Sequence, residues 1–431
     1  YISKIVEKTI LKEVNVHMKT NNLDEPCQSA YREHHSTETA LLKIVNDLFV
    51  SVDEQKCVVV VFLDMSAAFD TVNHTIFINR LESDFGITGA AKQWFQSYLK
   101  DRTQAVNING TMSDHIIMDT ALPQGSTIGP DGYPKYVSPV FAIARKHGIC
   151  MHMYADDTQL YLEFLTQDWA NAKRKMEDCI AEIRIWLSKN CLKLNDSKTE
   201  FMLIGQPHRL KQIRNSFTFL SIGDSKVAPK TSAPNLGAIL DSTLSMELQV
   251  SNICRSCYFH LRWLGQIRKF LNEDSAIKLV HAFVTSKIDN LNSLLIKIPN
   301  NKIHRLQLIH NAAARIVTGT RRREHITPIL KQLHWLPIPA RIEYKVLLTT
   351  FKALNGLAPD YLKKLISYKI YKKATKSSKL KLLDEPVMRL ATIGDRAFSA
   401  YAPKIWNKVL YDICTIGRID SFKTALKHFL F

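Results

Sequence analysis

The sequence predicts an α+β fold, and three patterns support that prediction. Residues 57–63 form the most β-branched apolar run in the chain, which is typical of a buried strand. Two shorter apolar segments, 149–153 and 160–162, flank Tyr154-Ala155-Asp156-Asp157 and predict a hairpin. Apolar residues recur at helical spacing before residue 50 and again between residues 245 and 298. We therefore expect a small antiparallel sheet combined with helices.

Further elements follow from the same kinds of pattern. A helix is predicted over 38–50, because Ser36-Thr37 is a helix start signal. Residues 192–204 are expected to form a strand or hairpin, and the polar basic run 372–381 a loop. The other expected helices are 90–99, 170–190, 302–317 and 339–354.

Carboxylates stand at the ends of the predicted strands. Asp64 directly follows the buried run, and Asp156 and Asp157 lie at the tip of the hairpin. Adjacent carboxylates repel each other and lose hydration, so a bound cation stabilises such a group. Hard oxygen ligands of this kind suit Mg²⁺, which is often shared with substrate phosphates. A solvated acidic turn is the alternative interpretation of the hairpin residues taken alone.

A polar turn precedes the hairpin. Residues 122–126 read Leu-Pro-Gln-Gly-Ser, and Gly129-Pro130 follows. Gly125 gives the backbone the freedom to approach a ligand closely, and the Gln124 amide can hydrogen-bond a base or a sugar. A simple turn without a binding role is the alternative.

The order of these elements resembles the palm of reverse transcriptases: a strand ending in Asp, then Pro-Gln-Gly, then Tyr-Ala-Asp-Asp. The residues of these motifs are similar to those of non-LTR retrotransposon (LINE-type) enzymes in particular. Similarity extends along the whole chain, and several motifs in the correct order are hard to attribute to coincidence. The similar stretches are 28–32, 36–40, 63–70, 122–130, 154–161, 305–323, 333–337 and 394–399.

The resemblance implies a right-hand polymerase with fingers, a palm on a small antiparallel sheet, a helical thumb and a helical basic C-terminal domain. The implied function is that of an RNA-directed DNA polymerase fragment. A catalytically inactive nucleic-acid-binding relic is the alternative, and the tail from residue 301 argues against a group II intron maturase. The implied segments are 1–56 (part of the fingers), 57–241 (palm with interleaved fingers elements), 242–298 (thumb) and 299–431 (C-terminal domain).

The resemblance also assigns the metal site. Asp64, Asp156 and Asp157 would hold two Mg²⁺ ions, one activating the primer 3′-hydroxyl and one neutralising the triphosphate. Asp157 is the least secure ligand of the three, and ordinary strand-end acids are the alternative. Residues 236–241 would form the hairpin that grips the primer end.

Five residues are assigned to the nucleotide in the same way. Phe69 would lie under the incoming sugar, where its bulk excludes a 2′-hydroxyl, with Gln124 and Gly125 in the same pocket. Arg32 would lie near the template and the nucleotide. Lys198 would lie near the triphosphate and could donate a proton to pyrophosphate. A core phenylalanine, a solvated arginine and a surface lysine are the respective alternatives.

The charge of the chain is concentrated in its last third. Of the net charge of +18, residues 301–431 contribute +17, with 25 Lys and Arg against 8 Asp and Glu. Nucleic acid is the commonest partner of such a segment, and a solubility role is the alternative. Removing 301–431 should weaken nucleic-acid binding but spare the polymerase fold, because the assigned site lies upstream. The cations expected to form the surface are Arg305, Arg315, Arg321, Arg322, Arg323, Lys331, Arg341 and Lys345.

One segment departs from the family pattern. Residues 131–139 contain two prolines and a glycine where the family has an apolar helix, and these residues are poor helix material. We therefore expect an irregular, poorly packed segment that weakens the palm, as in a decayed copy of the element.

The eight cysteines fit reduced thiols better than a disulfide framework, because several lie inside apolar stretches. Cys254, Cys257 and His260 have zinc-like spacing, but no second cysteine pair is near. Buried helix positions are therefore the favoured interpretation, and no zinc is expected.

The expected partners follow from the family and the chain's composition. They are template RNA, primer or target DNA, and deoxynucleotide triphosphates. No apolar run approaches the ~20 residues of a membrane helix, so no membrane is expected. The chain starts at Tyr1, so we expect a fragment whose parent carries an upstream endonuclease domain. The expected location is an intracellular ribonucleoprotein of nucleus and cytoplasm.

Overall fold

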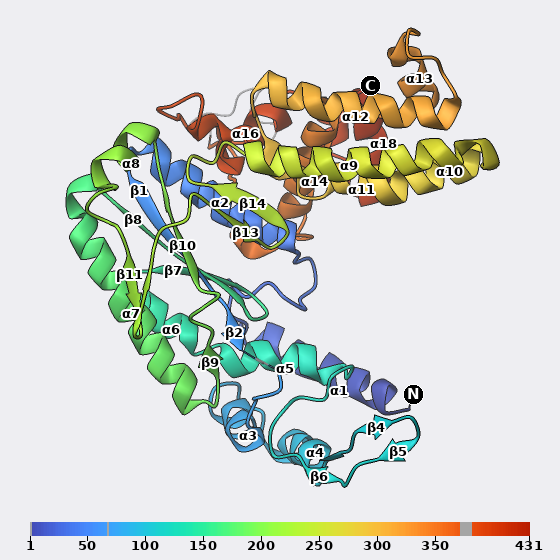
Figure 1. Cartoon of the computed structure of the whole chain (residues 1–431). Helices are drawn as coiled ribbons and strands as arrows, with labels where there is room; N and C mark the ends of the chain where they lie inside the picture. Colours follow the sequence, from blue (N-terminus) through green and yellow to red (C-terminus); the bar gives the residue numbers. More distant parts are fainter. Residues whose placement is uncertain (1, 67–68, 371–381) are drawn as a thin grey trace. The chain divides into compact units, whose positions relative to one another are not determined.

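The computed structural model describes residues 2–66, 69–370 and 382–431 (Figure 1). Helices and small sheets are mixed along the chain, so the predicted α+β class is confirmed. The chain divides into two compact units built from discontinuous segments. Unit 1 comprises residues 1–33, 59–201 and 213–229, and unit 2 comprises residues 34–58, 202–212 and 230–431. The assignment of fingers, palm, thumb and C-terminal domain to consecutive segments stays a prediction.

A four-stranded sheet in the order β10-β1-β8-β7 carries the predicted acids. The central strand β1 (Cys57–Leu63) is buried along almost its whole length, as its apolar run predicts. β7 (Cys150–Tyr154) and β8 (Asp157–Phe164) pair antiparallel with Tyr154 opposite Asp157, so the predicted hairpin is confirmed. β10 (Glu200–Ile204) forms the edge on the other side of β1.

The other elements of unit 1 are helices and two-stranded pairs. The predicted helices over 90–99 and 170–190 are confirmed as α4 and α7. The helices are α1 (Ile2–Thr20), α3 (His74–Ser83), α4 (Gly89–Leu99), α5 (Ile128–Val137), α6 (Val140–Lys146) and α7 (Trp169–Lys189), with the short η1 (Thr166–Asp168). The strand pairs are β2 (Met65–Ser66) with β9 (Lys193–Leu194), β3 (Thr103–Gln104) with β6 (Ile116–Ile117), β4 (Asn107–Ile108) with β5 (Thr111–Met112), and β11 (Leu220–Ile222) with β12 (Ser225–Val227).

The prediction that residues 131–139 are irregular and poorly packed is wrong. Most of the segment lies in α5, and α6 begins immediately after it. Pro134 lies inside α5, where it has no N–H to donate to the carbonyl of Pro130 and where its ring crowds that carbonyl. Tyr133 and Tyr136 are fully buried, and the Tyr136 hydroxyl donates a 2.6 Å hydrogen bond to the Asn190 carbonyl. Tertiary packing therefore overrides the weak local helix propensity.

This packing is tight at Gly132, because a Cβ there would lie 3.0 Å from Phe77 Cζ and 3.2 Å from Leu122 Cδ1. We expect Gly132→Ala to lower the free energy of unfolding by about 1–3 kcal/mol, the usual range for overpacking. Urea unfolding of the full chain measures the effect. Gly265→Ala is the matched control, since a Cβ there meets nothing within 4 Å. Equal stability of the two variants would contradict the packing argument.

Unit 2 is mainly helical. The predicted helices over 38–50, 302–317 and 339–354 are confirmed as α2, α12 and α14, and Ser36 caps α2 with a capping box. The longer helices are α2 (Thr37–Asp53), α9 (Glu247–Ile267), α10 (Glu273–Val280), α12 (Asn300–Thr318), α14 (Ile338–Leu354), α16 (Phe398–Trp406) and α18 (Ile419–Phe429). The shorter ones are α8 (Pro207–Ile213, except its last residue), α11 (Ser286–Asp289), α13 (Ile326–Gln332), α15 (Asp360–Lys363), α17 (Tyr411–Cys414), η2 (Arg268–Phe270), η3 (His281–Thr285), η4 (Asn292–Leu295) and η6 (Gly394–Arg396).

Three further expectations from the sequence concern unit 2. β13 (Ser232–Asn235) and β14 (Ala238–Asp241) form a hairpin, as expected around 236–241. Cys254 and Cys257 are buried on α9, which confirms their interpretation as helix-core positions. The expected loop over 372–381 lies outside the described residues. None of the helices in the described ranges is long and apolar enough to span a membrane.

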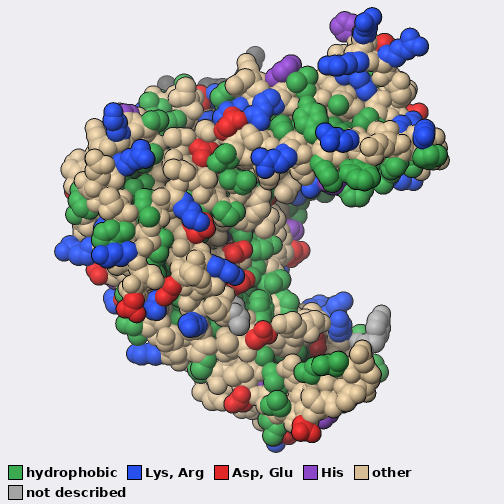
Figure 2. All heavy atoms as spheres, in the orientation of Figure 1, with side chains coloured by type: hydrophobic (Ala, Val, Ile, Leu, Met, Phe, Trp, Pro, Cys, Tyr) green, Lys and Arg blue, Asp and Glu red, His purple; other side chains and the backbone are tan. Residues whose placement is uncertain are grey.

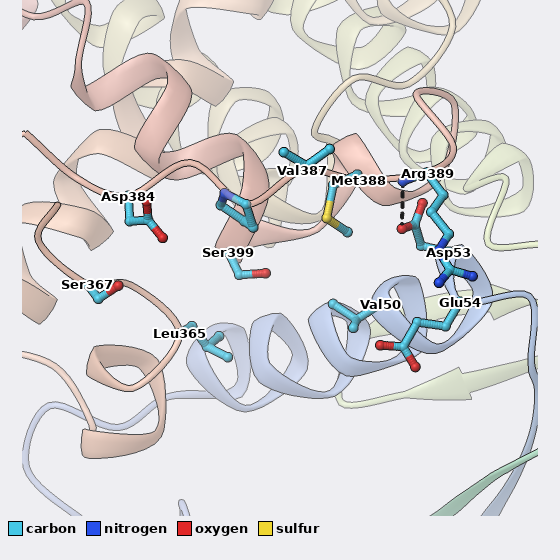
Figure 3. A pocket seen from close by; sticks show the side chains of 11 residues that line it. Val50, Asp53, Glu54, Leu365, Ser367, Asp384, Val387, Met388, Arg389 and Ser399 are labelled. Atoms are coloured by element: carbon cyan, nitrogen blue, oxygen red, sulfur yellow. Dashed lines mark hydrogen bonds between the residues drawn. The ribbon is translucent and has the colours of Figure 1, made fainter. Parts of the chain in front are cut away.

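Helix α2 contacts residues from the C-terminal third of the chain. The buried Asp53 carboxylate accepts hydrogen bonds from the backbone N–H groups of Arg389 (2.9 Å) and Leu390 (2.7 Å), beside a pocket of about 410 Å³ (Figure 3). The Arg396 guanidinium lies 4.6 Å from the centre of the Phe49 ring. Removal of 301–431 would take these contacts away from α2, so they argue against the expectation that the fold survives this removal, and the expectation stays untested.

Candidate active site

Three carboxylates come together where β1 and β8 lie side by side in the sheet. Asp64 follows β1, Asp156 occupies the hairpin turn, and Asp157 opens β8. Desolvation, together with the nearby negative charges of Asp156 and Asp64, raises the pKa of the Asp157 carboxyl. The three predicted acids are therefore electrostatic neighbours, although they are distant in the sequence.

Asp64 also has neighbours from the turn after β9. The Asn195 side-chain amide donates to Asp64 Oδ2 at 3.1 Å, and Lys198 Nζ lies 3.6 Å from the same oxygen. Lys198 is largely exposed, with 69% of its side-chain surface accessible, so it can move without a large burial penalty. Lys198 is therefore a neighbour of Asp64. Its expected place near the triphosphate and its role as a proton donor stay predictions.

The chemistry of the three carboxylates fits a divalent cation, because they offer only hard oxygen ligands. In the part of the chain that the structure describes, no three His, Cys, Asp or Glu side chains are grouped tightly enough to hold a metal ion. The Lys198 ammonium is the positive charge beside Asp64 in this arrangement. The assignment of Asp64, Asp156 and Asp157 as metal ligands therefore stays a prediction.

Phe69 lies in an aromatic cluster next to the acids. Its ring centre is 4.7 Å from that of Tyr133 and 6.5 Å from that of Tyr31. Burial and the charge of Asp156 raise the pKa of both tyrosine hydroxyls, which places Asp156 near the same cluster. The chain turns at Phe69, so this ring does not follow the strict alternation of a strand.

The polar turn at residues 122–126 is joined to the segment that carries Phe69. Gln124 Nε2 donates a 2.9 Å hydrogen bond to Asp70 Oδ1, and the Leu122 N–H donates to the Phe69 carbonyl. Gly125 has φ +78°, a conformation that favours glycine, and a Cβ there would meet open space. Gln124 and Gly125 are therefore exposed beside the segment that carries Phe69. Their place in a nucleotide pocket stays a prediction.

The Arg32 side chain is bonded to residues of its own loop. Its guanidinium donates to the carbonyls of Glu25 (2.7 Å) and Gln28 (3.0 Å) and lies 3.6 Å from an Asp24 carboxylate oxygen. The alternative of a freely solvated arginine is therefore wrong. A contact of Arg32 with template or nucleotide stays a prediction.

Gln28 is a residue that sequence reasoning missed. It lies in a stretch that resembles the family, yet nothing in its local pattern indicated a role. The structure buries its side chain, 3% exposed, against the backbone of Ala155 in the acidic hairpin. The contact joins residues 127 positions apart, so only the folded chain reveals it.

Some of the predicted basic tail residues are exposed, whereas others are bonded within unit 2. Arg305 pairs with Glu247, and Arg315 donates to the Glu324 carbonyl at 3.2 Å. Figure 2 shows Lys and Arg side chains gathered around α13. The exposed members of the predicted set near α13 are Arg321, Arg322, Arg323 and Lys331. Within the set, the members held in ion pairs inside unit 2 are Arg305, Arg341 (with Asp289, 2.6 Å) and Lys345 (with Glu38, 2.9 Å).

One face of α9 presents aromatic and basic side chains to solvent. Tyr258, Phe259 and Trp263 are 49%, 60% and 56% exposed. Arg255 and Arg262 are also exposed and lie three or four positions from the first two of these aromatic residues, on the same face of the helix. Hydrophobic and basic side chains are intermingled over the region of α9 and α10 in Figure 2. Exposed aromatic rings next to cations are the usual composition of a surface that binds single-stranded nucleic acid.

Residues 1–239 match the family model described as reverse transcriptase (RNA-dependent DNA polymerase). The chain belongs to the reverse transcriptase family. The match includes the three acids, the Phe69 cluster and the Gln124 turn. The resemblance to reverse transcriptases, inferred from the motifs, is therefore confirmed. Enzymes of this family use divalent metal ions, in agreement with the carboxylate site.

Curated relatives support the LINE-type resemblance. The chain is 25% identical over 331 residues to the probable RNA-directed DNA polymerase from transposon BS of Drosophila melanogaster, covering 74% of this chain and 35% of that protein. It is 23% identical over 266 residues to the RNA-directed DNA polymerase from the mobile element jockey of the same species, covering 58% and 27%. The chain thus spans about a third of the length of these relatives.

Solved structures with detectable likeness include telomerases. The apo telomerase of Candida tropicalis covers 76% of this chain and 51% of its own, at 12% identity and a TM-score of 0.43. The telomerase of Candida albicans in complex with a fragment of telomeric RNA covers 80% and 55%, at 11% identity and a TM-score of 0.38.

Proposed function

We propose that this chain is the polymerase part of a LINE-type retrotransposon protein, which extends a DNA 3′ end by copying RNA with Mg²⁺ as its metal. The observation that carries the proposal is that Asp64, Asp156 and Asp157 are electrostatic neighbours beside the Phe69 aromatic cluster. Membership of the reverse transcriptase family supports the same chemistry.

The acids provide the chemistry of the proposed reaction. Bound Mg²⁺ would supply the charge that activates the primer 3′-hydroxyl and offsets the triphosphate. Asp64 and Asp156 would hold the metal, with Asp157 supplementing their negative charge. The Lys198 ammonium lies 3.6 Å from Asp64. When the nucleotide binds, Lys198 would leave this carboxylate, contact the triphosphate and donate a proton to the departing pyrophosphate.

The aromatic cluster provides the proposed selection of deoxynucleotides. The Phe69 ring packs on Tyr133, which is completely buried and hydrogen-bonds the Met65 sulfur at 3.1 Å. A ring supported in this way resists displacement, so a 2′-hydroxyl on the incoming sugar would clash with it. The Gln124 amide, held at 2.9 Å from Asp70, would contact the nucleotide beside it.

The relic alternative has lost the feature that favoured it. That feature was the segment 131–139, which was expected to be poorly packed, whereas Tyr133, Tyr136 and Val137 are fully buried in α5. The structure therefore supplies no local defect beneath the proposed site in this segment.

Extension of a labelled DNA primer on an RNA template by the full chain tests the proposal. We expect products only when deoxynucleotides and a divalent metal are both present. Tight RNA binding without any extension would overturn the proposal and leave the inactive relic.

The exposed aromatic face of α9 is proposed as a nucleic-acid contact. We expect Trp263→Ala to weaken binding of single-stranded RNA by about 1–3 kcal/mol, because a stacking contact is lost. The salt dependence should stay unchanged for Trp263→Ala, whereas Arg262→Ala should reduce the salt slope by about one unit, since one phosphate contact is lost. Fluorescence anisotropy at several salt concentrations measures both effects.

The control for this test is Tyr411→Ala, which removes an aromatic side chain that is 43% exposed on α17. Equal RNA affinity of the Trp263→Ala and Tyr411→Ala variants would show that α9 is not a binding surface.

A further inference from the structure

The turn that carries the acids has an unfavourable backbone conformation. β7 and β8 are joined by a two-residue turn, Ala155-Asp156, because Tyr154 pairs with Asp157. Ala155 has φ +59°, in the left-handed region that glycine normally occupies at the first position of such a turn. A side chain in this region persists only when the surrounding structure holds it there.

Gln28 is the side chain that holds this turn. Its Oε1 accepts hydrogen bonds from the N–H groups of Ala155 (3.2 Å) and Ala30 (3.1 Å), and its Nε2 donates to the Ala155 carbonyl at 3.5 Å. The amide therefore contacts both backbone polar groups of the strained residue. Only a side chain with an acceptor and a donor can do so.

The backbone around Gln28 is itself fixed to β7. The Ser29 N–H donates to the Met153 carbonyl, and the Met153 N–H donates to the Cys27 carbonyl, both at 2.9 Å. Ser29 Oγ and His152 Nε2 are 2.8 Å apart, within hydrogen-bond distance. Residues 27–29 thus run beside the edge strand and deliver the Gln28 amide to the turn.

We propose that Gln28 is a positioning residue for the reaction: it holds Ala155 in the left-handed conformation and so presents Asp156 and Asp157 toward the metal. This inference rests on the proposed function. The acids follow Ala155 directly in the chain, so a change in its φ redirects both carboxylates. On the other side of the turn, Thr158 Oγ1 donates to the Asp156 carbonyl at 3.2 Å.

Gln28→Met tests the inference, because methionine has a similar shape but cannot make these hydrogen bonds. We expect Mn²⁺ binding by the full chain, measured by electron paramagnetic resonance, to weaken about 10-fold. The kcat of primer extension should fall at least about 10-fold, while the KM for deoxynucleotide changes little, because the nucleotide pocket is untouched. Gln96→Met, the same change at an exposed position of α4, should leave both values unchanged.

Ala155→Gly provides the decisive second variant. Glycine adopts positive φ without support, so we expect the double variant Gln28→Met/Ala155→Gly to recover most of the lost Mn²⁺ affinity and kcat. Failure of glycine to restore Mn²⁺ binding would overturn the inference, since Gln28 would then act through general packing. If Gln28→Met alone fails to fold, recovery of folding and Mn²⁺ binding in the double variant supports the inference, and failure of the double variant overturns it.

The metal-binding measurement separates the two proposals. A wild-type chain that binds Mn²⁺ but extends no primer would disprove the polymerase function, while the Gln28 and Ala155 variants would still test the turn. Unchanged Mn²⁺ binding in Gln28→Met would overturn the inference even if the wild type is an active polymerase.

Discussion

Deletion of residues 301–431 is expected to unfold the rest of unit 2. The deletion removes α15, η6 and α16, which contact α2, the helix in which Leu41, Ile44 and Phe49 are buried. It also removes the two backbone N–H groups from which the Asp53 carboxylate accepts hydrogen bonds. We expect the truncated chain to aggregate or to show rapid hydrogen exchange throughout α2. Slow exchange in α2 of a soluble truncated chain would contradict this result.

A single substitution reproduces part of this effect. Asp53→Ala removes a buried carboxylate that accepts hydrogen bonds from two backbone N–H groups, so we expect a loss of about 1–3 kcal/mol in the free energy of unfolding. Asp274→Ala is the control, since its side chain is 71% exposed and makes only a surface pair with Lys278. Matching unfolding curves for the two variants would show that Asp53 does not anchor the tail.

Asp156→Asn is expected to reduce metal-dependent primer extension by roughly 10²–10³-fold, the effect of losing one strong electrostatic contact to the transition state. RNA binding should change little, because that binding is proposed to depend on α9 and on the exposed cations near α13. The measurements are single-turnover extension and RNA affinity on the same preparation.

Asp114→Asn is the matched control for this prediction, since Asp114 is an exposed acid of unit 1 outside the site. If Asp156→Asn extends primers as well as Asp114→Asn does, the hairpin acids are not the metal ligands.

Elements specified by a local pattern could be predicted from the sequence. The apolar run over 57–63 is long enough to mark a buried strand, and the flanking apolar segments mark the hairpin at Ala155-Asp156. The capping residue Ser36 marks the start of α2. Each of these signals lies within a few residues of the element that it forms, so no knowledge of the tertiary fold is needed.

Features that depend on distant partners could not be predicted. The helix over 131–137 forms because Tyr133 and Tyr136 are buried, although Gly132 and Pro134 weaken it locally. The sequence shows Arg305 as a free cation, but the fold pairs it with Glu247, 58 residues away. In each of these cases a long-range contact outweighs the local preference.

The residues of the candidate site could be named from the sequence, whereas the residues that support them could not. The family motifs identified Asp64, Asp156, Phe69 and Gln124, and the structure places these residues together around one end of the sheet. The motif containing Gln28 was visible as well, but the pattern of its neighbours says nothing about the turn that the amide contacts.

Addition of a single nucleotide on four RNA templates that differ in one base tests the polymerase function most directly. The full chain is incubated with each template, an annealed DNA primer, Mg²⁺ and one deoxynucleotide at a time. We expect efficient addition only of the nucleotide complementary to the template base, and no addition without the metal. RNA binding without addition of any nucleotide, or addition that ignores the template base, would contradict the proposal that this chain copies RNA into DNA.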